Sequence, residues 1–572
     1  MSQETKTHSS NSVHACQNCT NSFTIEPDDF AFYEKIKVPS PTWCPDCRQQ
    51  RRYAWRNERT MYRRNCDLCG KSTVTIYSPN KPFKVYCPPC WWGDGWEGKE
   101  FGRDFDFSKP FFEQFQALQL EVPRIALLTK NSTASEFTNH SGDNKNCFMD
   151  TSCFYSENVL NSNWIMHSRD CADCLYFYTK GERCYQCIDS RNCYHCQFGT
   201  LLKDCSDCFY CYDCHGCTDC FLSSNLRNRS YYFLNKPYSK EEYAAKVAEF
   251  KLGSHGSRTK LLEQYLDLIQ HKTLHRPIIM EQSVQAEGSM IFNCKNIRQC
   301  FDADYFEDVA YGVSGIEVKD SMDFYHCGFK TELIYECHAV VRSYMVLFSH
   351  LSYDNSHISY CDSCHNDQNL FGCVGLKKTE YCILNKQYSP EEYETLKNKI
   401  IEKMKETREY GEFFPVAMSP IGYNETQGQV YMPMTKQEVL AKGWKWEDAV
   451  PGTFGKETVT TAGMPDTIDE VTDSIVNEVL ACQTCQKNFK IVEPELQFYR
   501  REMIPIPRKC LDCRYRLRIA LRPPRKLFIR DCPCVSGHFH GDQKCPNEFE
   551  SSFEPARPET VYCEGCYQSE VV

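Results

Sequence analysis

The sequence has no long hydrophobic run and no recognisable leader. No apolar stretch approaches the roughly 20 residues that a membrane-spanning helix needs. Residues 1–13 are polar and lack the charged start and apolar core of a secretory signal. We therefore expect a cytoplasmic protein, because closely spaced cysteines in that reducing compartment bind metal as thiolates and do not form disulfides.

Catalytic motifs are missing as well. The sequence contains no glycine-rich phosphate loop, no nucleophile elbow and no His-Glu-x-x-His zinc-protease motif. The histidines in the middle of the chain are scattered without metal-ligand spacing. We expect a structural or interaction protein more than an enzyme, although a catalytic cysteine–histidine pair formed by residues distant in the sequence stays open.

Basic residues are fewer than acidic residues. The 66 lysine and arginine residues are outnumbered by 76 acidic residues, which gives a net charge of −10. This balance excludes a uniformly basic coat for nucleic acid, but it leaves room for local basic patches. At 572 residues the chain is too long for a single core and is expected to fold as several domains.

Cysteine, in contrast, is abundant. The 39 cysteines are an odd number, and most form pairs separated by two residues, a spacing that suits a metal-binding knuckle far better than a disulfide. An internal duplication places such pairs at both ends of the chain. Five cysteines recur 466 positions later: Cys16, Cys19, Cys44, Cys47 and Cys66 become Cys482, Cys485, Cys510, Cys513 and Cys532.

The duplication continues with a longer offset in the last module. Three further cysteines recur 476 positions later, ten more than before: Cys69, Cys87 and Cys90 become Cys545, Cys563 and Cys566. The ten inserted residues bring extra candidate ligands, namely Cys534, His538 and His540. The offset favours Cys532 as the fourth ligand of this module, with Cys534 or His540 as alternatives.

These cysteines predict four zinc sites, about four ions per chain, because four thiolates are enough for tetrahedral zinc. The predicted ligands are Cys16, Cys19, Cys44, Cys47, Cys66, Cys69, Cys87, Cys90, Cys482, Cys485, Cys510, Cys513, Cys532, Cys545, Cys563 and Cys566. Sequential pairing and an interleaved cross-brace use the same residues, and both stay open. An all-thiolate shell leaves no open coordination position, so we expect the zinc to be structural.

The first module of each pair resembles a zinc-ribbon family. The residues that carry the resemblance are Cys16, Cys19, Phe23, Ile25, Phe32, Tyr33, Pro41, Cys44, Cys47 and Arg48. The resemblance covers about 40 residues at each end and implies zinc, without implying an activity. As a whole, the chain is similar to uncharacterised cysteine-rich proteins of uncultivated bacteria, some of which carry a class III CoA-transferase label. The chain lacks the repeated strand–helix units of such an enzyme.

An arginine-rich, aromatic stretch of equal length separates the two sites of each pair, at positions 48–65 and 514–531. Arginines among aromatic residues suit phosphate contact and base stacking, so RNA or a ribonucleoprotein is the preferred partner. The candidate contact residues are Arg51, Arg52, Arg56, Arg516 and Arg518. The alternative is that these arginines bridge the paired modules and neutralise acidic neighbours such as Asp29 and Glu495.

The middle of the chain, residues 139–388, contains short units of polar, cysteine and aromatic residues. Cysteines such as Cys184 and Cys205 are about 21 residues apart, which predicts a β-solenoid with about this number of residues per turn. Cysteines in such a stack line its interior as small side chains. Six thiols spaced by three, from Cys205 to Cys220, leave further metal or a redox function open, since a period-two strand cannot point them all to one side.

The middle region is itself duplicated, with an offset of 150. Both halves end alike, and the endings predict helices capped by Ser239 and Ser389, with Glu242 and Glu392 at the capping-box position. The predicted fold is therefore mainly β, with zinc-ribbon or treble-clef-like modules at both ends and a central β-solenoid-like repeat in two halves, each closed by helices.

The predicted organisation follows the chain in twelve segments. These are 1–13, disordered N-terminus; 14–50, zinc module 1; 51–100, zinc module 2; 101–138, connector; 139–238, first repeat half; 239–280, helical segment; 281–388, second repeat half; 389–412, helix; 413–447, aromatic and proline-rich segment; 448–476, linker; 477–515, zinc module 3; and 516–572, zinc module 4. The predicted function is a zinc-binding scaffold for a macromolecule. The alternative is a redox or metal-dependent enzyme that uses the central cysteines.

Overall fold

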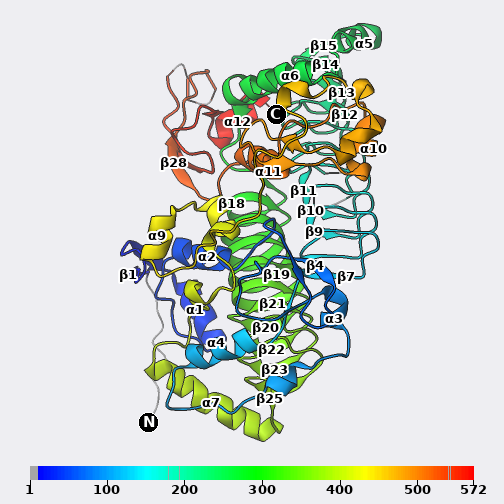
Figure 1. The fold of residues 1–572 in the computed structure, drawn as a ribbon. Coiled ribbons are helices and arrows are strands. Elements are labelled where there is room, and N and C mark those ends of the chain that lie inside the picture. Colours follow the sequence, from blue (N-terminus) through cyan, green and yellow to red (C-terminus); the bar gives the residue numbers. More distant parts are fainter. Residues whose placement is uncertain (1–10, 178–179, 192, 539, 542, 572) are drawn as a thin grey trace. The chain divides into compact units, whose positions relative to one another are not determined.

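The computed structural model describes residues 11–177, 180–191, 193–538, 540–541 and 543–571. The chain forms two compact units, and each is built from two separate stretches (Figure 1). Unit 1 combines Met1–Ala126 with Ile279–Val450, and unit 2 combines Leu127–Ile278 with Pro451–Val572. Each unit therefore contains one pair of terminal cysteine modules and the repeat half that lies farther from it in the sequence.

Unit 1 contains two small hairpins, a long parallel ladder and several helices. In chain order its elements are β1 (Ser12–Ala15), β2 (Ser22–Ile25), α1 (Pro27–Lys35), α2 (Pro45–Tyr53), β3 (Tyr62–Asn65), β4 (Ser72–Thr75), β5 (Val85–Tyr86), α3 (Pro88–Trp92), η1 (Gly98–Phe101), α4 (Phe111–Glu121), β6 (Arg124–Ile125), β17 (Met280–Glu281), β18 (Val284–Phe292), β19 (Lys295–Val341), β20 (Tyr344–Leu347), β21 (His350–Tyr353), β22 (Ser356–Ser359), β23 (Gln368–Phe371), β24 (Glu380–Ile383), β25 (Lys386–Gln387), α7 (Pro390–Glu406), η3 (Val416–Met418), η4 (Tyr423–Glu425), α8 (Gln427–Tyr431) and α9 (Lys436–Ala441).

Unit 2 repeats this plan with its own ladder, hairpins and helices. Its elements are β7 (Thr129–Lys130), β8 (Ser141–Gly142), β9 (Thr151–Phe154), β10 (Asn163–Met166), β11 (Leu175–Phe177), β12 (Ser206–Phe209), β13 (Thr218–Phe221), β14 (Ser230–Phe233), β15 (Lys236–Pro237), α5 (Lys240–Ala248), α6 (His255–Asp267), η2 (Leu268–Lys272), β16 (Leu274–His275), η5 (Thr461–Gly463), η6 (Ile468–Glu470), η7 (Asp473–Asn477), β26 (Leu480–Ala481), β27 (Asn488–Phe489), α10 (Glu493–Arg501), α11 (Leu511–Ala520), β28 (Phe528–Asp531), β29 (Glu548–Ser551), β30 (Thr560–Val561) and α12 (Glu564–Val571).

The fold is mixed α/β with many parallel sheets, so the expectation of a mainly β chain is met only in part. Of the disordered segment expected over residues 1–13, residues 1–10 lie outside the described chain, and β1 already begins at Ser12. No helix in the described part of the chain combines the length and the apolar character that crossing a bilayer would need.

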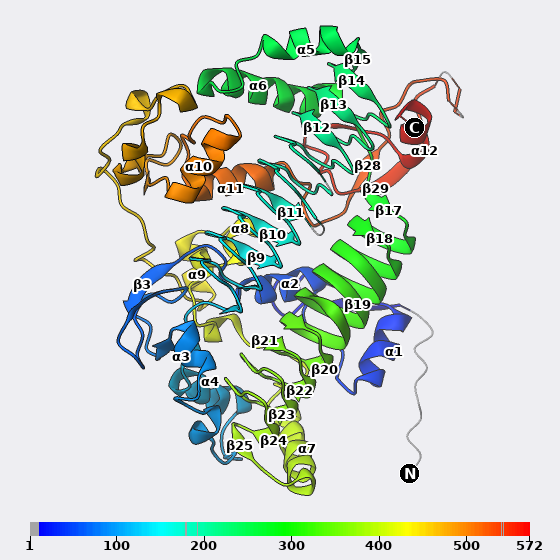
Figure 2. The same cartoon turned by 90° about the vertical axis from the view of Figure 1, so that its right-hand side faces the viewer.

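Most successive strands of both ladders repeat every twelve positions, with local pairings at eleven (Val284 with Lys295) and thirteen (Arg169 with Glu182). The longer turn expected from the spacing of Cys184 and Cys205 is therefore wrong. In unit 2, Cys208 pairs in parallel with Cys220, and in unit 1, Leu370 pairs with Cys382. The strands stack in each unit in this register (Figure 2). Cys184 and Cys205 are separated by a multiple of three positions, and three is the period that places a side chain inside.

The backbone explains this period of three. Along the ladders every third residue has a positive φ, for example Asp204, Asp207 and Tyr210 in unit 2. A left-handed residue turns the chain, so the residue that follows it points inward each time. The six closely spaced thiols are consequently all buried, at 0–2% exposure: Cys205, Cys208, Cys211, Cys214, Cys217 and Cys220. The expectation that one strand could not bury all six is wrong, because it assumed a period of two.

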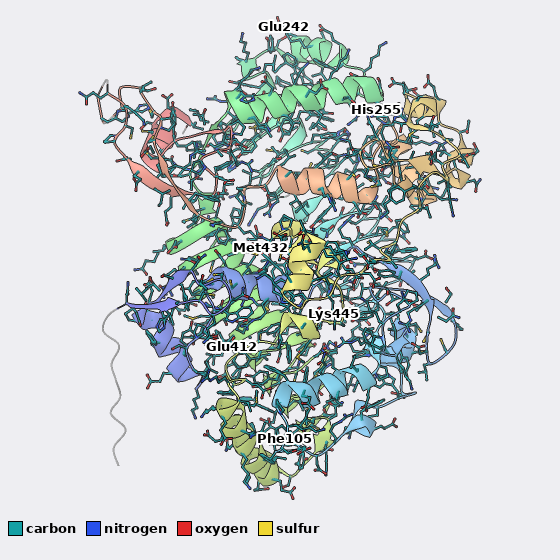
Figure 3. The ribbon with its side chains drawn as sticks, turned by 60° about the vertical axis from the view of Figure 1, so that its left-hand side comes forward. Phe105, Glu242, His255, Glu412, Met432 and Lys445 are labelled. Carbon is teal, nitrogen blue, oxygen red and sulfur yellow. The ribbon has the colours of Figure 1, made fainter. Side chains whose placement is uncertain are left out.

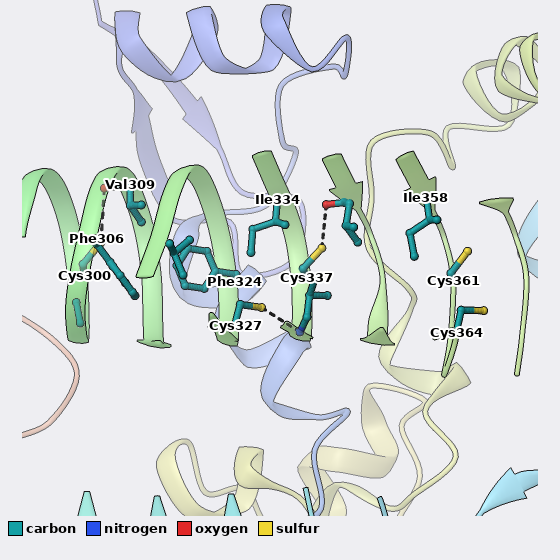
Figure 4. Close-up of a cluster of buried hydrophobic side chains, with 14 of the residues drawn as sticks. Cys300, Phe306, Val309, Phe324, Cys327, Ile334, Cys337, Ile358, Cys361 and Cys364 are labelled. Atoms are coloured by element: carbon teal, nitrogen blue, oxygen red, sulfur yellow. Dashed lines mark hydrogen bonds between the residues drawn. The ribbon is translucent and has the colours of Figure 1, made fainter. Parts of the chain in front are cut away.

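Inner side chains of the ladders also complete the backbone hydrogen bonding. In unit 1 the amide of Val340 donates to Sγ of Cys327 at 3.3 Å, and Sγ of Cys337 donates to the carbonyl of Val346 at 3.2 Å (Figure 4). Ser321 takes the same role, since its Oγ accepts from the amide of Ile334 at 3.1 Å. Cysteine and serine therefore fit the inner row because they are small and can both donate and accept.

Capped helices follow both ladders, as the sequence predicts. Ser239 accepts a hydrogen bond from the amide of Glu242 at the start of α5, and Ser389 accepts one from Glu392 at the start of α7. In both helices the glutamate side chain returns to the capping amide, which completes a capping box. The two predicted caps are confirmed.

Candidate metal centres

The structure brings the predicted cysteines together in four groups of four. The groups are Cys16, Cys19, Cys44 and Cys47; Cys66, Cys69, Cys87 and Cys90; Cys482, Cys485, Cys510 and Cys513; and Cys532, Cys545, Cys563 and Cys566. Within each group all four sulfur atoms lie within 4.8 Å of one another. The arrangement is sequential, so the interleaved pairing that the sequence left open is not formed.

One hydrogen bond recurs in every module. The amide of the third cysteine donates to the sulfur of the first: Cys44 to Cys16, Cys87 to Cys66 and Cys510 to Cys482 at 3.2 Å, and Cys563 to Cys532 at 3.3 Å. Such bonds stabilise a thiolate, which is the form that ligates metal. Burial alone would raise the pKa of Cys16, but amide donors from Cys44, Cys19 and Asn18 outweigh it and lower this pKa to about 6.

In three modules a helix begins at the third cysteine. Cys44 is the N-cap of α2, Cys87 that of α3 and Cys510 that of α11. The positive end of each helix dipole therefore lies at a ligand cysteine. The closing knuckle overlaps the first turn of each helix, since Cys47 lies in α2, Cys90 in α3 and Cys513 in α11. The chain therefore folds locally around the sulfur atoms.

The last module contains a second, overlapping group. Cys534, His540 and Cys566 also lie within 4.8 Å of one another, so Cys566 is shared with the group of four. Nε2 of His540 is 3.5 Å from Sγ of Cys566, while Nδ1 lies 2.8 Å from the carbonyl of Gln543. A proton on Nδ1 places the lone pair that can ligate a metal on Nε2. Cys532 thus completes a group of four. The two alternatives expected from the sequence, Cys534 and His540, also lie close to Cys566.

The arginine-rich stretch of unit 1 is buried against the ladder. Arg48 contacts Asp323 at 2.8 Å, and Arg52 contacts Asp323 at 3.3 Å and Glu336 at 2.9 Å. Arg51 bridges Glu336 at 2.9 Å and Glu412 at 2.7 Å; Figure 3 labels Glu412. These guanidinium groups are not available at the surface.

The same arrangement is found in unit 2. Arg514 forms an ion pair with Asp173, and Arg518 contacts the other oxygen of this carboxylate at 2.9 Å. Arg514 also contacts Glu495 at 3.0 Å. We refer to Arg48 and Arg52 on Asp323, and to Arg514 and Arg518 on Asp173, as the two arginine clamps.

These contacts correct the predicted nucleic-acid residues. Four of the five candidates, Arg51, Arg52, Arg56 and Arg518, are 0–3% exposed. Arg56 forms its ion pair with Glu58 at 2.5 Å. Only Arg516 of the five is exposed. The alternative interpretation, that acidic residues neutralise these arginines, describes the four buried arginines better. Their principal acidic partners, however, lie in the ladders.

Asp173 and Asp323 are not among the residues predicted from the sequence, although the duplication links them. They differ by 150 positions, the offset of the two repeat halves, and Arg48 and Arg514 differ by 466, the offset of the modules. The offset of 466 therefore relates the two arginines, and the offset of 150 relates the two aspartates, of one duplicated ion pair. The two offsets taken together are the signal in the sequence that could have found this contact.

The central thiols form no further metal site in the described part of the chain. Every group of candidate ligands there belongs to the terminal modules. Instead, the inner thiols donate to backbone carbonyls, as Cys184 does to Glu182 and Cys193 at 3.2 Å. Burial raises the pKa of Cys153 well above its ordinary value, so this group is a neutral thiol at physiological pH.

Comparison with known proteins does not identify a family. No family model matches the chain, and no curated protein matches it. Among solved structures, a proposed acetyltransferase from Desulfovibrio desulfuricans G20 is 8% identical, with 46% of this chain and 68% of that chain covered and a TM-score of 0.09. Such a likeness supports no conclusion about fold or function, and the zinc-ribbon resemblance remains a prediction.

Proposed function

We propose that the chain is a zinc-stabilised scaffold, in which terminal cysteine modules fix the ladders that present a surface to a macromolecular partner. The observation that carries the proposal is the duplicated arginine clamp. Arg48 and Arg514 each follow a ligand cysteine, Cys47 and Cys513, directly in the sequence. A metal ion that holds this cysteine would therefore also hold the arginine that binds the ladder.

Zinc is the metal that suits these sites best. Groups of four cysteines with short knuckle spacings are typical of structural zinc. Modules this small bury too little apolar surface to fold without a bound metal ion. A closed shell of four thiolates leaves no position for a substrate. The proposed role of all four ions is consequently to stabilise the fold.

We further propose that each ladder is a β-solenoid with one turn for every twelve positions. Parallel pairing at this spacing, a left-handed residue at every third position and an inner row of small side chains support it. A solenoid offers an extended face for another macromolecule. RNA remains the first partner to test, although among the five predicted contact residues only Arg516 is exposed.

Metal analysis of the purified full-length chain tests the structural part of the proposal. We expect about four zinc ions per chain and a colourless protein. Coloured protein, or a metal content well above four, would favour the alternative of a redox enzyme built on the central thiols.

Partner binding needs a separate experiment. Retention of RNA from the cell's own lysate is compared between the wild type and Arg516→Glu, with Lys260→Glu as a charge-matched control at another exposed position. Loss of RNA only in Arg516→Glu supports an RNA partner. If the wild type retains no RNA, RNA is rejected as the partner; if all three proteins retain it equally, Arg516 is rejected as a contact residue. Neither result affects the zinc measurement.

A further inference from the structure

Unit 2 contains a cavity of about 410 Å³ that no part of the proposed scaffold role explains. Its walls come from three elements of this unit: the ladder at Tyr185 and Phe198, the helix α6 at Arg258 and Leu262, and the third cysteine module at residues 504–509. A volume of this size is typical of sites for small molecules.

Two buried arginines in the wall form no salt bridge within the described part of the chain. Arg508 is 7% exposed and Arg258 is 6% exposed. Nη2 of Arg508 donates to the carbonyls of Met464 and Pro465, and Nη2 of Arg258 donates to Oε1 of Gln197 at 2.7 Å. Nη1 of each has no hydrogen-bond partner, and neither arginine forms an ion pair, within the part of the chain that the structure describes.

The cavity wall also contains one arginine that is already neutralised. Arg514 of the clamp lines the cavity and is paired with Asp173 and Glu495. Arg258 and Arg508, in contrast, have no such ion pair among the described residues, and the lining includes no aspartate or glutamate. The neighbouring carboxylate of Asp466 is already bonded to Ser254 and to the amide of Gly256. Asp466 attracts Arg508 electrostatically but forms no salt bridge with it, and burial still lowers the pKa of Arg508. A buried cation without a directly bonded carboxylate is costly, so the two arginines indicate that an anion completes the site.

A third cationic group and the apolar lining narrow the class of ligand. Lys509 also lines the cavity, as does His255, the first residue of α6 (labelled in Figure 3). Burial, followed by the charge of Arg508, lowers the pKa of His255, which is consistent with uncompensated positive charge here. Leu262, Ile506 and other apolar side chains supply most of the remaining wall.

We propose that this cavity binds a small organic anion, with a carboxylate or phosphate head on Arg258 and Arg508 and an apolar body against Leu262 and Ile506. Charge-assisted hydrogen bonds to the two unpaired Nη1 groups would hold the head. Because Gln483 and Thr484 of the cysteine knuckle also line the cavity, the bound metal would shape one wall of the site.

Isothermal titration calorimetry on the zinc-loaded full-length chain tests the proposal with octanoate and phenyl phosphate as probes. We expect one of the two anions to bind, and octanamide, the uncharged analogue of octanoate, to bind at least tenfold more weakly. Equal binding of octanoate and octanamide, or no binding of either anion, would overturn the proposal.

Two variants locate the binding site. Arg508→Met should weaken binding of the anion at least tenfold, and Thr259→Trp, a change on the exposed side of α6, should block the cavity without removing a charge. Lys260→Ala, next to Thr259 but not in the wall, is the matched control and should bind as the wild type does. Unchanged binding in Thr259→Trp overturns the assignment. Zinc content, measured on each variant, separates this result from a failure of the scaffold proposal.

Discussion

Arg516 and Arg518 stand two positions apart on α11, yet their environments are opposite. The guanidinium of Arg518 is buried and contacts Asp173 at 2.9 Å, whereas Arg516 is exposed. Sequence alone treats them alike, because both belong to one basic stretch. The difference arises from helix geometry: one face of α11 packs on the ladder and the other faces solvent.

We predict that Arg518→Met destabilises unit 2 by about 1.5–3 kcal/mol, the cost of losing a hydrogen bond to a charged group. Asp173 keeps its contact with Arg514, so the loss stays below that of leaving a carboxylate with no partner. The thermal midpoint of the unfolding transition measures the effect. Arg516→Met is the matched control and is expected to stay within about 0.5 kcal/mol of the wild type. Equal effects of the two changes would contradict the buried ion pair.

The last module offers a second test at the residue scale. Cys532 completes a group of four sulfur atoms, while Cys534 belongs to the overlapping group with His540. We predict that Cys532→Ser lowers the zinc content by about one ion per chain and that Cys534→Ser leaves it unchanged. Metal analysis of the two variants checks this. A loss of zinc in Cys534→Ser would instead show that this thiol is the fourth ligand.

At the scale of the element, the inner row of the ladders explains why serine and cysteine exchange so freely along the repeats. Both can accept from the amide of the next turn, as Ser321 and Cys327 do. We predict that Ser321→Cys is nearly neutral in unit 1, whereas Ser321→Ala leaves the amide of Ile334 without a partner and costs about 1–3 kcal/mol. Chemical denaturation of both variants measures the difference. If Ser321→Ala is as stable as Ser321→Cys, packing alone explains the inner row.

Buried thiols of the ladders also predict a dependence on pH. Burial raises the pKa of Cys153 and of Cys337 well above the ordinary value of 9.0. The thiol form is favoured in the fold, so the stabilisation is fully present below about pH 9 and declines as the pH rises beyond it. We expect the contribution of these two thiols to stability to fall above pH 9, and Cys153 and Cys337 to resist a thiol reagent at pH 8 in the native protein. Rapid labelling of Cys153 at pH 8, detected by mass spectrometry, would support the redox alternative.

The sequence predicts local features of these elements well and the ladder geometry poorly. The capping boxes at Ser239 and Ser389 depend on neighbouring residues, and both are formed. The turn of twelve positions depends on left-handed backbone at residues such as Tyr210 and Leu222, residue types that rarely adopt it. The residue types at these left-handed positions therefore give no sign of the turn. The spacing of the cysteines reflects the inward period of three and not the length of a turn.

At the scale of the whole molecule, two duplications with different offsets produce two units of one plan. The offset of 466, which becomes 476 within the last module, relates the module pairs, and the offset of 150 relates the repeat halves. Each unit joins one copy of both, and the same arginine–aspartate contact recurs in each. The ligands were predictable because cysteine spacing is local. The pairing of modules with the distant repeat half was not, because it depends on contacts across hundreds of residues.

This organisation predicts that loss of a metal ligand in one module pair destabilises the ladder of the same unit. Cys44→Ser removes a ligand beside the clamp of Asp323, and Cys510→Ser removes the corresponding ligand beside the clamp of Asp173. Hydrogen exchange read by mass spectrometry should show faster exchange around residues 321–340 in Cys44→Ser and around residues 170–190 in Cys510→Ser. The reason is that each clamp connects a module to the ladder of the same unit. Exchange that rises equally in both ladders for either variant, or in neither, would contradict the role proposed for the zinc modules, because the metal would then not be what fixes the arginines on the ladder.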